Sequence, residues 1–189
     1  IMNNATFFFN QPKNEPVLSY AKGSKERELL SKELEKQYNQ CIEIPIIING
    51  KEIRTGNVSE VVMPTEHSHV LAKFHKADKE TVQKAIESAL EARKKWENVH
   101  WIDRCSIMLR AAELLAGKYR YVINAATMLG QGKNPFQAEI DSACETIDFL
   151  RFNVHYASKI YAQQPLSDNS AINRLEYRGL EGFVYAISP

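Results

Sequence analysis

The run Ile46-Ile47-Ile48-Asn49-Gly50-Lys51-Glu52-Ile53 carries the clearest local fold signal in the sequence. Consecutive β-branched isoleucines favour an extended strand, and Asn-Gly supplies the two positive-φ positions of a tight hairpin turn. The sequence therefore predicts a β-hairpin within residues 44–55. A second, weaker strand pair is predicted at residues 60–62 and 70–74, on either side of Pro64.

Helical periodicity flanks these strands on both sides. Upstream, Ser24 is a favourable N-cap for a highly charged helix that ends near Tyr38. Downstream, Asp78 can cap one helix, and Asp103 can cap the next, which Gly117 ends. We expect the helix after Asp103 to bury one apolar face, made of Ile107, Ala111, Leu114 and Leu115.

The longest helix is predicted to begin after Asn134 and to end near Gln163. Asn134 is the N-cap, Pro135 takes the first helical position and Gln137 the third, which is a capping-box arrangement. A shorter helix is predicted just before it, over residues 118–129, with glycines at its end. The buried face of the longest helix should hold Ala143, Ile147, Leu150, Val154 and Tyr161.

The two ends of the chain differ from this body. Residues 1–23 have little periodicity and predict an arm or tail. At the other end, residues 175–178 and 183–187 are predicted to be strands, and no element follows the second one. The chain also begins with Ile1 and not with methionine. We therefore expect a piece of a longer protein, because a parallel strand needs a crossover and neighbouring strands.

The composition excludes several classes of function. The 189 residues are 44% hydrophobic and 25% charged, which is typical of a globular protein of about one domain. With 24 basic and 23 acidic residues, the net charge of +1 gives no polybasic surface for nucleic acid. Apolar runs such as Ile46-Ile47-Ile48 are far shorter than the roughly 20 residues that span a bilayer. Three cysteines argue against a disulfide framework and for a reducing compartment.

Glu139 occupies the most informative position. It precedes Ala143 by four residues and Ile147 by eight, so helical spacing places its carboxylate at the end of an apolar face. A buried carboxylate needs a partner or a polar cavity, which would fit a substrate pocket and a raised pKa. Spacing alone favours the alternative, an exposed side chain whose charge suits the start of a helix.

Other motifs favour ordinary structural roles. Gly130-Gln131-Gly132-Lys133 fails as a phosphate loop, because Thr127 stands where the first glycine is needed. His67 and His69 lack carboxylate or thiolate partners in sequence, so they predict surface histidines and no metal site. Cys105 and Cys144 lie among apolar residues of helices and predict small buried side chains.

Several runs resemble the aldehyde dehydrogenase superfamily. They are Ile48-Asn49-Gly50-Lys51, Ala92-Arg93-Lys94-Lys95-Trp96, and Gly182-Phe183-Val184-Tyr185-Ala186-Ile187-Ser188-Pro189. Narrower runs resemble the branch that oxidises glutamate gamma-semialdehyde to glutamate in proline breakdown. Among them are Asn14-Glu15-Pro16-Val17-Leu18, Gln137-Ala138-Glu139-Ile140-Asp141 and Tyr177-Arg178-Gly179-Leu180-Glu181-Gly182.

This resemblance implies an NAD-dependent enzyme of the mitochondrial matrix, with a small-molecule substrate and no nucleic acid or membrane partner. The complete protein would be a homo-oligomer. In the family a cysteine thiolate attacks the aldehyde, an asparagine and a backbone N–H hold the oxyanion, and the cofactor takes the hydride. Cys41, Cys105 and Cys144 do not match that cysteine, and the other motifs lie beyond Pro189. The 189 residues alone are therefore expected to be inactive.

Three residues carry over from the resemblance as site residues. Glu139 matches the aldehyde-pocket glutamate of the branch, which reverses the preference that spacing alone gave. Ser188 and Ile187 match strand-end residues that touch NAD, in agreement with ligand binding at the carboxyl ends of strands.

The resemblance also implies an α/β fold like that of the N-terminal portion of an aldehyde dehydrogenase. Residues 1–23 would be an arm, and 24–174 the helical part of the NAD-binding domain with the early hairpin. Residues 175–189 would be strands leading into the oligomerisation sheet and the Rossmann-type nucleotide-binding sheet. Two alternatives stay open. The first is a non-catalytic helical interaction module, although such a module has no use for the apolar strand at 183–187. The second is a sister enzyme with another substrate, which should lack the run around Glu139.

Overall fold

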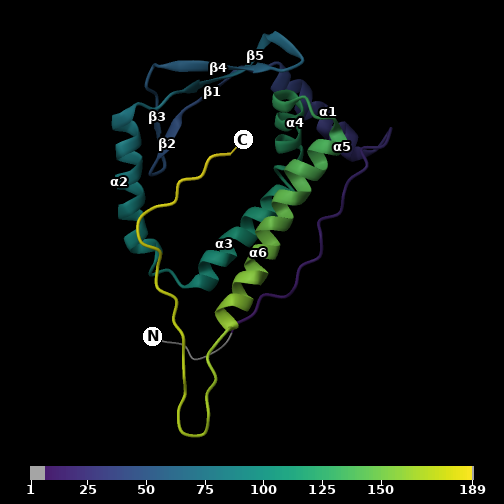
Figure 1. The fold of residues 1–189 in the computed structure, drawn as a ribbon. Coiled ribbons are helices and arrows are strands. Elements are labelled where there is room, and N and C mark those ends of the chain that lie inside the picture. The colour runs from purple at the N-terminus through teal and green to yellow at the C-terminus, as the bar shows by residue number, and fades with distance from the viewer. Residues whose placement is uncertain (1–6, 189) are drawn as a thin grey trace.

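The computed structural model describes residues 7–188, which form a mixed α/β structure with two small sheets and several helices (Figure 1). The sheets lie at the top of Figure 1, α2 descends on one side, and α3 and α6 descend on the other. In chain order the elements are α1 (Lys25–Tyr38), β1 (Ile42–Ile44), β2 (Ile46–Ile48), β3 (Lys51–Ile53), β4 (Val58–Met63), β5 (Glu66–His75), α2 (Lys79–Trp96), α3 (Trp101–Ala116), α4 (Arg120–Gln131), α5 (Pro135–Ala138), the π-helix η1 (Glu139–Cys144) and α6 (Glu145–Ala162).

Both predicted strand pairs are confirmed. Strands β2 and β3 form the antiparallel hairpin, and its turn residues Asn49 and Gly50 have φ values of 51° and 72°. Strands β4 and β5 form the second pair, longer than predicted, and β1 adds to β5 in parallel, with Ile42 opposite Ala72. The sequence did not signal β1, because three residues are too few to show an alternating pattern.

The helix starts are confirmed at three of the four predicted caps, Ser24, Asp78 and Asn134. The Ser24 hydroxyl accepts a hydrogen bond from the N–H of Arg27, and Asp78 accepts one from Thr81. The cap predicted at Asp103 is wrong, since α3 begins earlier, at Trp101, and His100 caps it. An aspartate in the first turn still interacts favourably with the helix dipole, which is why the sequence pattern misplaced the start.

The core lies between α3, η1 and α6. Ala112, Ala143 and Ile147 are fully buried there, and Leu115 and Leu150 pack against them. The face predicted for α3 is therefore correct in part. Ile107, predicted to be buried, is 51% exposed, because α3 packs on α6 along the side that carries Ala112.

The longest predicted helix has the predicted start but is not one α-helix. Asn134 and Gln137 form a capping box in which each side chain accepts from the other's backbone N–H. After α5 the chain forms the π-helix η1 before α6 continues to Ala162. A π turn contains one residue more than an α turn, and nothing in the apolar spacing of Ala143 and Ile147 reveals it.

Residues 7–20, which we call the strap, contain no helix or strand but are not a loose tail. The strap runs along α6 and reaches the start of α1 (purple in Figure 1). His155 of α6 contacts the carbonyl oxygen of Phe9 through Nδ1 at 2.8 Å, and the Phe9 ring packs edge-on against Trp101. Residues 1–6 of the predicted arm lie outside the described residues.

The two strands predicted at residues 175–178 and 183–187 are not formed. Residues 163–188 are mostly extended and without a ladder partner in the part of the chain described here (yellow in Figure 1). An extended segment becomes a strand only when a neighbour accepts and donates its backbone hydrogen bonds. Side chains hold this segment instead: Arg93 donates to the carbonyl oxygen of Leu180, and Tyr161 packs against Tyr177.

We expect Asn134→Ala to lower the free energy of unfolding by about 1 kcal/mol, because the capping box loses its side-chain acceptor. Asn153→Ala on the exposed side of α6 is the matched control and should be neutral or slightly stabilising, since alanine is the better helix former. Urea unfolding of the purified protein measures both. Equal losses in the two variants would contradict the capping role.

Candidate functional site

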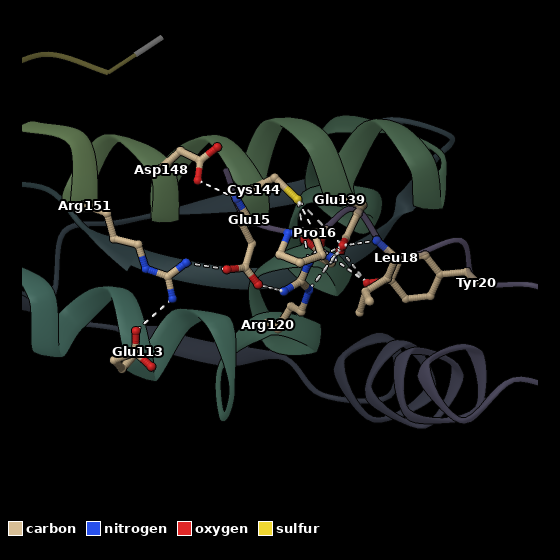
Figure 2. Close-up of polar contacts among 11 residues, drawn as sticks. Glu15, Pro16, Leu18, Tyr20, Glu113, Arg120, Glu139, Cys144, Asp148 and Arg151 are labelled. Carbon is tan, nitrogen blue, oxygen red and sulfur yellow. Dashed lines mark hydrogen bonds and ion pairs between the residues drawn. The ribbon is translucent and has the colours of Figure 1, made fainter. Parts of the chain in front are cut away.

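Glu139 is completely buried at the junction of α5 and η1. The exposed position that spacing alone favoured is therefore wrong. Its carboxylate accepts hydrogen bonds on both oxygens (Figure 2). Oε1 accepts from the N–H of Leu18 at 2.8 Å, while Oε2 accepts from the Tyr20 hydroxyl at 2.6 Å and from the Asn124 amide at 2.8 Å.

Arg120, the first residue of α4, is the cation that neutralises this carboxylate. Its guanidinium pairs with Glu139 through Nη2 and Nε, and its side chain is only 4% exposed. The same guanidinium reaches the strap, where it donates to Glu15 at 2.5 Å and to the carbonyl oxygen of Pro16 at 2.7 Å. One buried cation thus joins α4, η1 and the strap.

The contacts continue toward solvent from Glu15. Arg151 of α6 donates to the second carboxylate oxygen of Glu15 at 2.5 Å and to Glu113 of α3 at 2.8 Å. Asp148 of α6 accepts from the N–H of Glu15 at 2.7 Å. We call the linked residues the Glu139 network; it comprises Glu15, Tyr20, Glu113, Arg120, Asn124, Glu139, Asp148 and Arg151.

The local backbone explains how Tyr20 enters the network. Tyr20 has a φ of 51°, a left-handed conformation that is unusual for a bulky residue. It is buried against Leu30 of α1 and Ala125 of α4. Packing on one side and the hydrogen bond to Glu139 on the other hold Tyr20 in this strained conformation.

The network favours the ionised form of Glu139. Burial raises the pKa of its carboxyl, but hydrogen bonds from Arg120 and Tyr20 outweigh burial, so the pKa of Glu139 lies below its ordinary value. Burial, and then the hydrogen bond to Glu139, raises the pKa of the Tyr20 phenol. Near neutral pH, Tyr20 is therefore a donor and Glu139 a charged acceptor. The raised pKa that a general acid would need is not found at Glu139.

Cys144 lies at the edge of the network. Its sulfur is 3.6 Å from Nη2 of Arg120 and 3.8 Å from the carbonyl oxygen of Pro16. Burial, together with the charge of Glu139, raises the pKa of the Cys144 thiol to about 11, so the thiol is protonated and weakly nucleophilic. The prediction that Cys144 is buried is confirmed, whereas Cys105 is half-buried and Cys41 is exposed.

Ser188 and Ile187 lie at the far end of the extended C-terminal segment. Both are exposed, Ile187 by 76%, and no hydrogen bond within residues 7–188 links either one to the Glu139 network. Their contact with NAD and the contact of Glu139 with substrate stay predictions. In the same described residues no three His, Cys, Asp or Glu side chains are arranged to hold a metal ion. None of the helices there is both long and apolar enough to cross a bilayer.

Sequence reasoning found Glu139 but missed its partners. Glu15 and Arg120 are 105 residues apart, so no spacing rule connects them. One signal was available. Arg120 opens α4, where the helix dipole disfavours a positive charge, and such a residue calls for a nearby carboxylate.

Replacing Arg120 with methionine should destabilise the protein by about 3–5 kcal/mol, because Glu139 would stay buried without its cation. Arg54→Met is the matched control. Arg54 pairs with Glu43 and Glu52 at the surface, so its loss should have little effect. Urea unfolding compares the variants. Similar midpoints for both would show that the Arg120 pair contributes no more than a surface pair.

Acid should weaken the fold through Glu139. Because its pKa is lower in the folded protein, the ionised carboxylate stabilises the fold above the unfolded-state pKa of about 4.3, and this contribution is lost as the pH falls further. Glu139→Gln should therefore be less stable than the parent at pH 7, with a difference that shrinks toward pH 3. Urea midpoints across this range test it. A difference independent of pH would contradict the assignment.

Comparison with known proteins places the chain in a family. A profile described as "Aldehyde dehydrogenase family" matches residues 52–189. Delta-1-pyrroline-5-carboxylate dehydrogenase of Agaricus bisporus is 51% identical over 98% of this chain and 34% of its own length. The mitochondrial enzyme of that name from Homo sapiens is 49% identical over 93% of this chain and 31% of its own.

A solved structure agrees with these relatives. The Delta-pyrroline-5-carboxylate dehydrogenase from Mycobacterium tuberculosis, bound with NAD, superposes with a TM-score of 0.95 at 43% identity. The match covers 99% of this chain and 35% of that one, so the chain spans about a third of the length of the proteins it matches. Because the family profile covers most of its residues, the chain belongs to the aldehyde dehydrogenase family.

Proposed function

We propose that this chain is the N-terminal part of an NAD-dependent 1-pyrroline-5-carboxylate dehydrogenase. The complete enzyme would oxidise L-glutamate gamma-semialdehyde, the open form of pyrroline-5-carboxylate, to L-glutamate in proline breakdown. The observation that carries this proposal is the near-complete superposition on an NAD-bound enzyme of that name. Relatives that are about half identical in sequence to this chain carry the same name, which supports this substrate over that of a sister enzyme.

The C-terminal segment supports the view that more protein packs here. Side chains along it are largely exposed: Leu166 by 92%, Ile172 by 80% and Tyr185 by 78%. Folded proteins rarely leave so many large apolar groups in water without a partner surface. We therefore propose the division expected from the sequence, in which residues 175–189 join the oligomerisation and nucleotide-binding sheets of a homo-oligomer.

The free C-terminal residues fit a coenzyme contact. Ser188 and Ile187 are both exposed, so both would be available to contact NAD beside the completed sheet. When bound, NAD accepts the hydride from the substrate. The location we propose is the mitochondrial matrix, following the human relative named mitochondrial.

Glu139 is better suited to positioning than to direct contact with substrate. Its oxygens already accept from Leu18, Tyr20, Arg120 and Asn124, and the residue has no exposed surface. We propose that it shapes the aldehyde pocket by fixing the start of η1. This proposal keeps the predicted link to the pocket but makes the contact indirect.

An assay of NADH production with pyrroline-5-carboxylate tests the function. The full-length protein should turn over, and residues 1–189 alone should be inactive, because no cysteine among them matches the family's nucleophile. Turnover by the shorter chain would show that the chemistry lies within it. Activity of the full-length protein on other aldehydes but not on this substrate would favour a sister enzyme.

In the full-length protein, Glu139→Ala should lower kcat/KM, since the pocket would lose its support. Glu113→Ala at the exposed end of the network is the control and should leave kcat/KM near the parent value. If Glu139→Ala folds and retains parental kcat/KM, then Glu139 is a purely structural residue.

A further inference from the structure

The strap lies antiparallel to the helix that holds it. In chain order from η1 into α6, Glu139 accepts a hydrogen bond from the N–H of Leu18, and Asp148 accepts one from the N–H of Glu15. Further along α6, His155 contacts the carbonyl oxygen of Phe9. The holding side chains thus follow the strap in reverse order. They fasten it from the start of η1 to His155 in α6.

The π turn brings these side chains toward one side of the helix. An α-helix turns about 100° per residue, so Glu139 and Asp148 would point about 180° apart if the helix were unbroken. The extra residue of η1 removes about 100° from that angle. Asp148 and His155 are separated by about two full turns and already share a face. The π turn therefore allows one helix to hold the strap from Phe9 to Leu18.

The fastening is unlike that of a helix or strand. Among the described residues, 7–20 make no backbone–backbone hydrogen bond to the rest of the chain. Their polar contacts with the body go to side chains, and Phe8 and Val17 are 66% and 48% exposed. Tyr20 at the end of the strap is buried, but segments without backbone hydrogen bonds to the body open at lower free energy than the core.

We propose that the strap opens and closes as one unit over η1 and α6, and that Arg120 is its latch. Arg120 binds Glu15 and Pro16 on the strap and Glu139 on the helix, so it links the moving part to the fixed part. Opening breaks the contacts of Leu18 and Tyr20 with Glu139. This device goes beyond the proposed function and does not depend on which aldehyde the complete enzyme oxidises.

Cys144 is a built-in reporter of this motion. Its sulfur lies 3.8 Å from the carbonyl oxygen of Pro16, so the closed strap covers it. Cys41 is exposed and supplies an internal reference for the thiol reagent. An alkylating reagent followed by peptide mapping separates the two labelling rates in the full-length protein.

In the parent protein, Cys144 should label slowly, at a rate that depends less on urea concentration than global unfolding does, because strap opening exposes less surface than unfolding of the whole protein. Arg120→Met should label Cys144 at least tenfold faster, and Arg54→Met should label at the parent rate. Glu15→Gln, which removes one charge from the strap and leaves the Arg120–Glu139 pair intact, should also speed labelling.

Two results would overturn the proposal. The first is a parent labelling rate that follows global unfolding at every urea concentration, which would mean that the strap does not open on its own. The second is parental labelling in Glu15→Gln when the far-UV circular dichroism of that variant is unchanged. Both measurements remain decisive if Arg120→Met fails to fold.

Discussion

A carboxylate cannot be buried without a partner, and this constraint organises the structure. Glu139 has no exposed surface, so its negative charge requires a cation and several donors within reach. Arg120 supplies the cation, and Tyr20 and Leu18 supply donors from a distant part of the chain. The strap is thus held in part by one buried carboxylate that lies more than a hundred residues away in the sequence.

The same constraint accounts for the interruption of the longest helix. Apolar residues such as Ala143 and Ile147 set the face that packs on α3, and they leave no freedom to rotate the whole helix toward the strap. A local change in helical geometry at η1 lets Glu139 turn toward Arg120 while α6 keeps its packing. Short π segments are frequent at functional sites, and here the segment joins a buried ion pair to the core.

Turns and helix caps could be predicted from the sequence, whereas contacts between distant segments could not. The hairpin at Asn49 and Gly50, the caps at Ser24 and Asp78 and the capping box at Asn134 depend on neighbouring residues and were predicted correctly. Strand β1, the π turn and the partners of Glu139 depend on contacts between distant segments. The strands expected near the C-terminus also depend on neighbours, and none pairs with them within the described residues. Family resemblance gave the placement in the aldehyde dehydrogenases, which periodicity could not.

A double-mutant cycle between Arg120 and Glu139 tests the central claim most directly. The free energies of unfolding of Arg120→Met, Glu139→Gln and the double variant are compared with that of the parent. If a buried ion pair organises the site, the double variant loses less stability than the sum of the single variants, with a coupling energy of about 1–3 kcal/mol. Additivity within about 0.5 kcal/mol would contradict the account, because it would mean that the two side chains stabilise the protein independently.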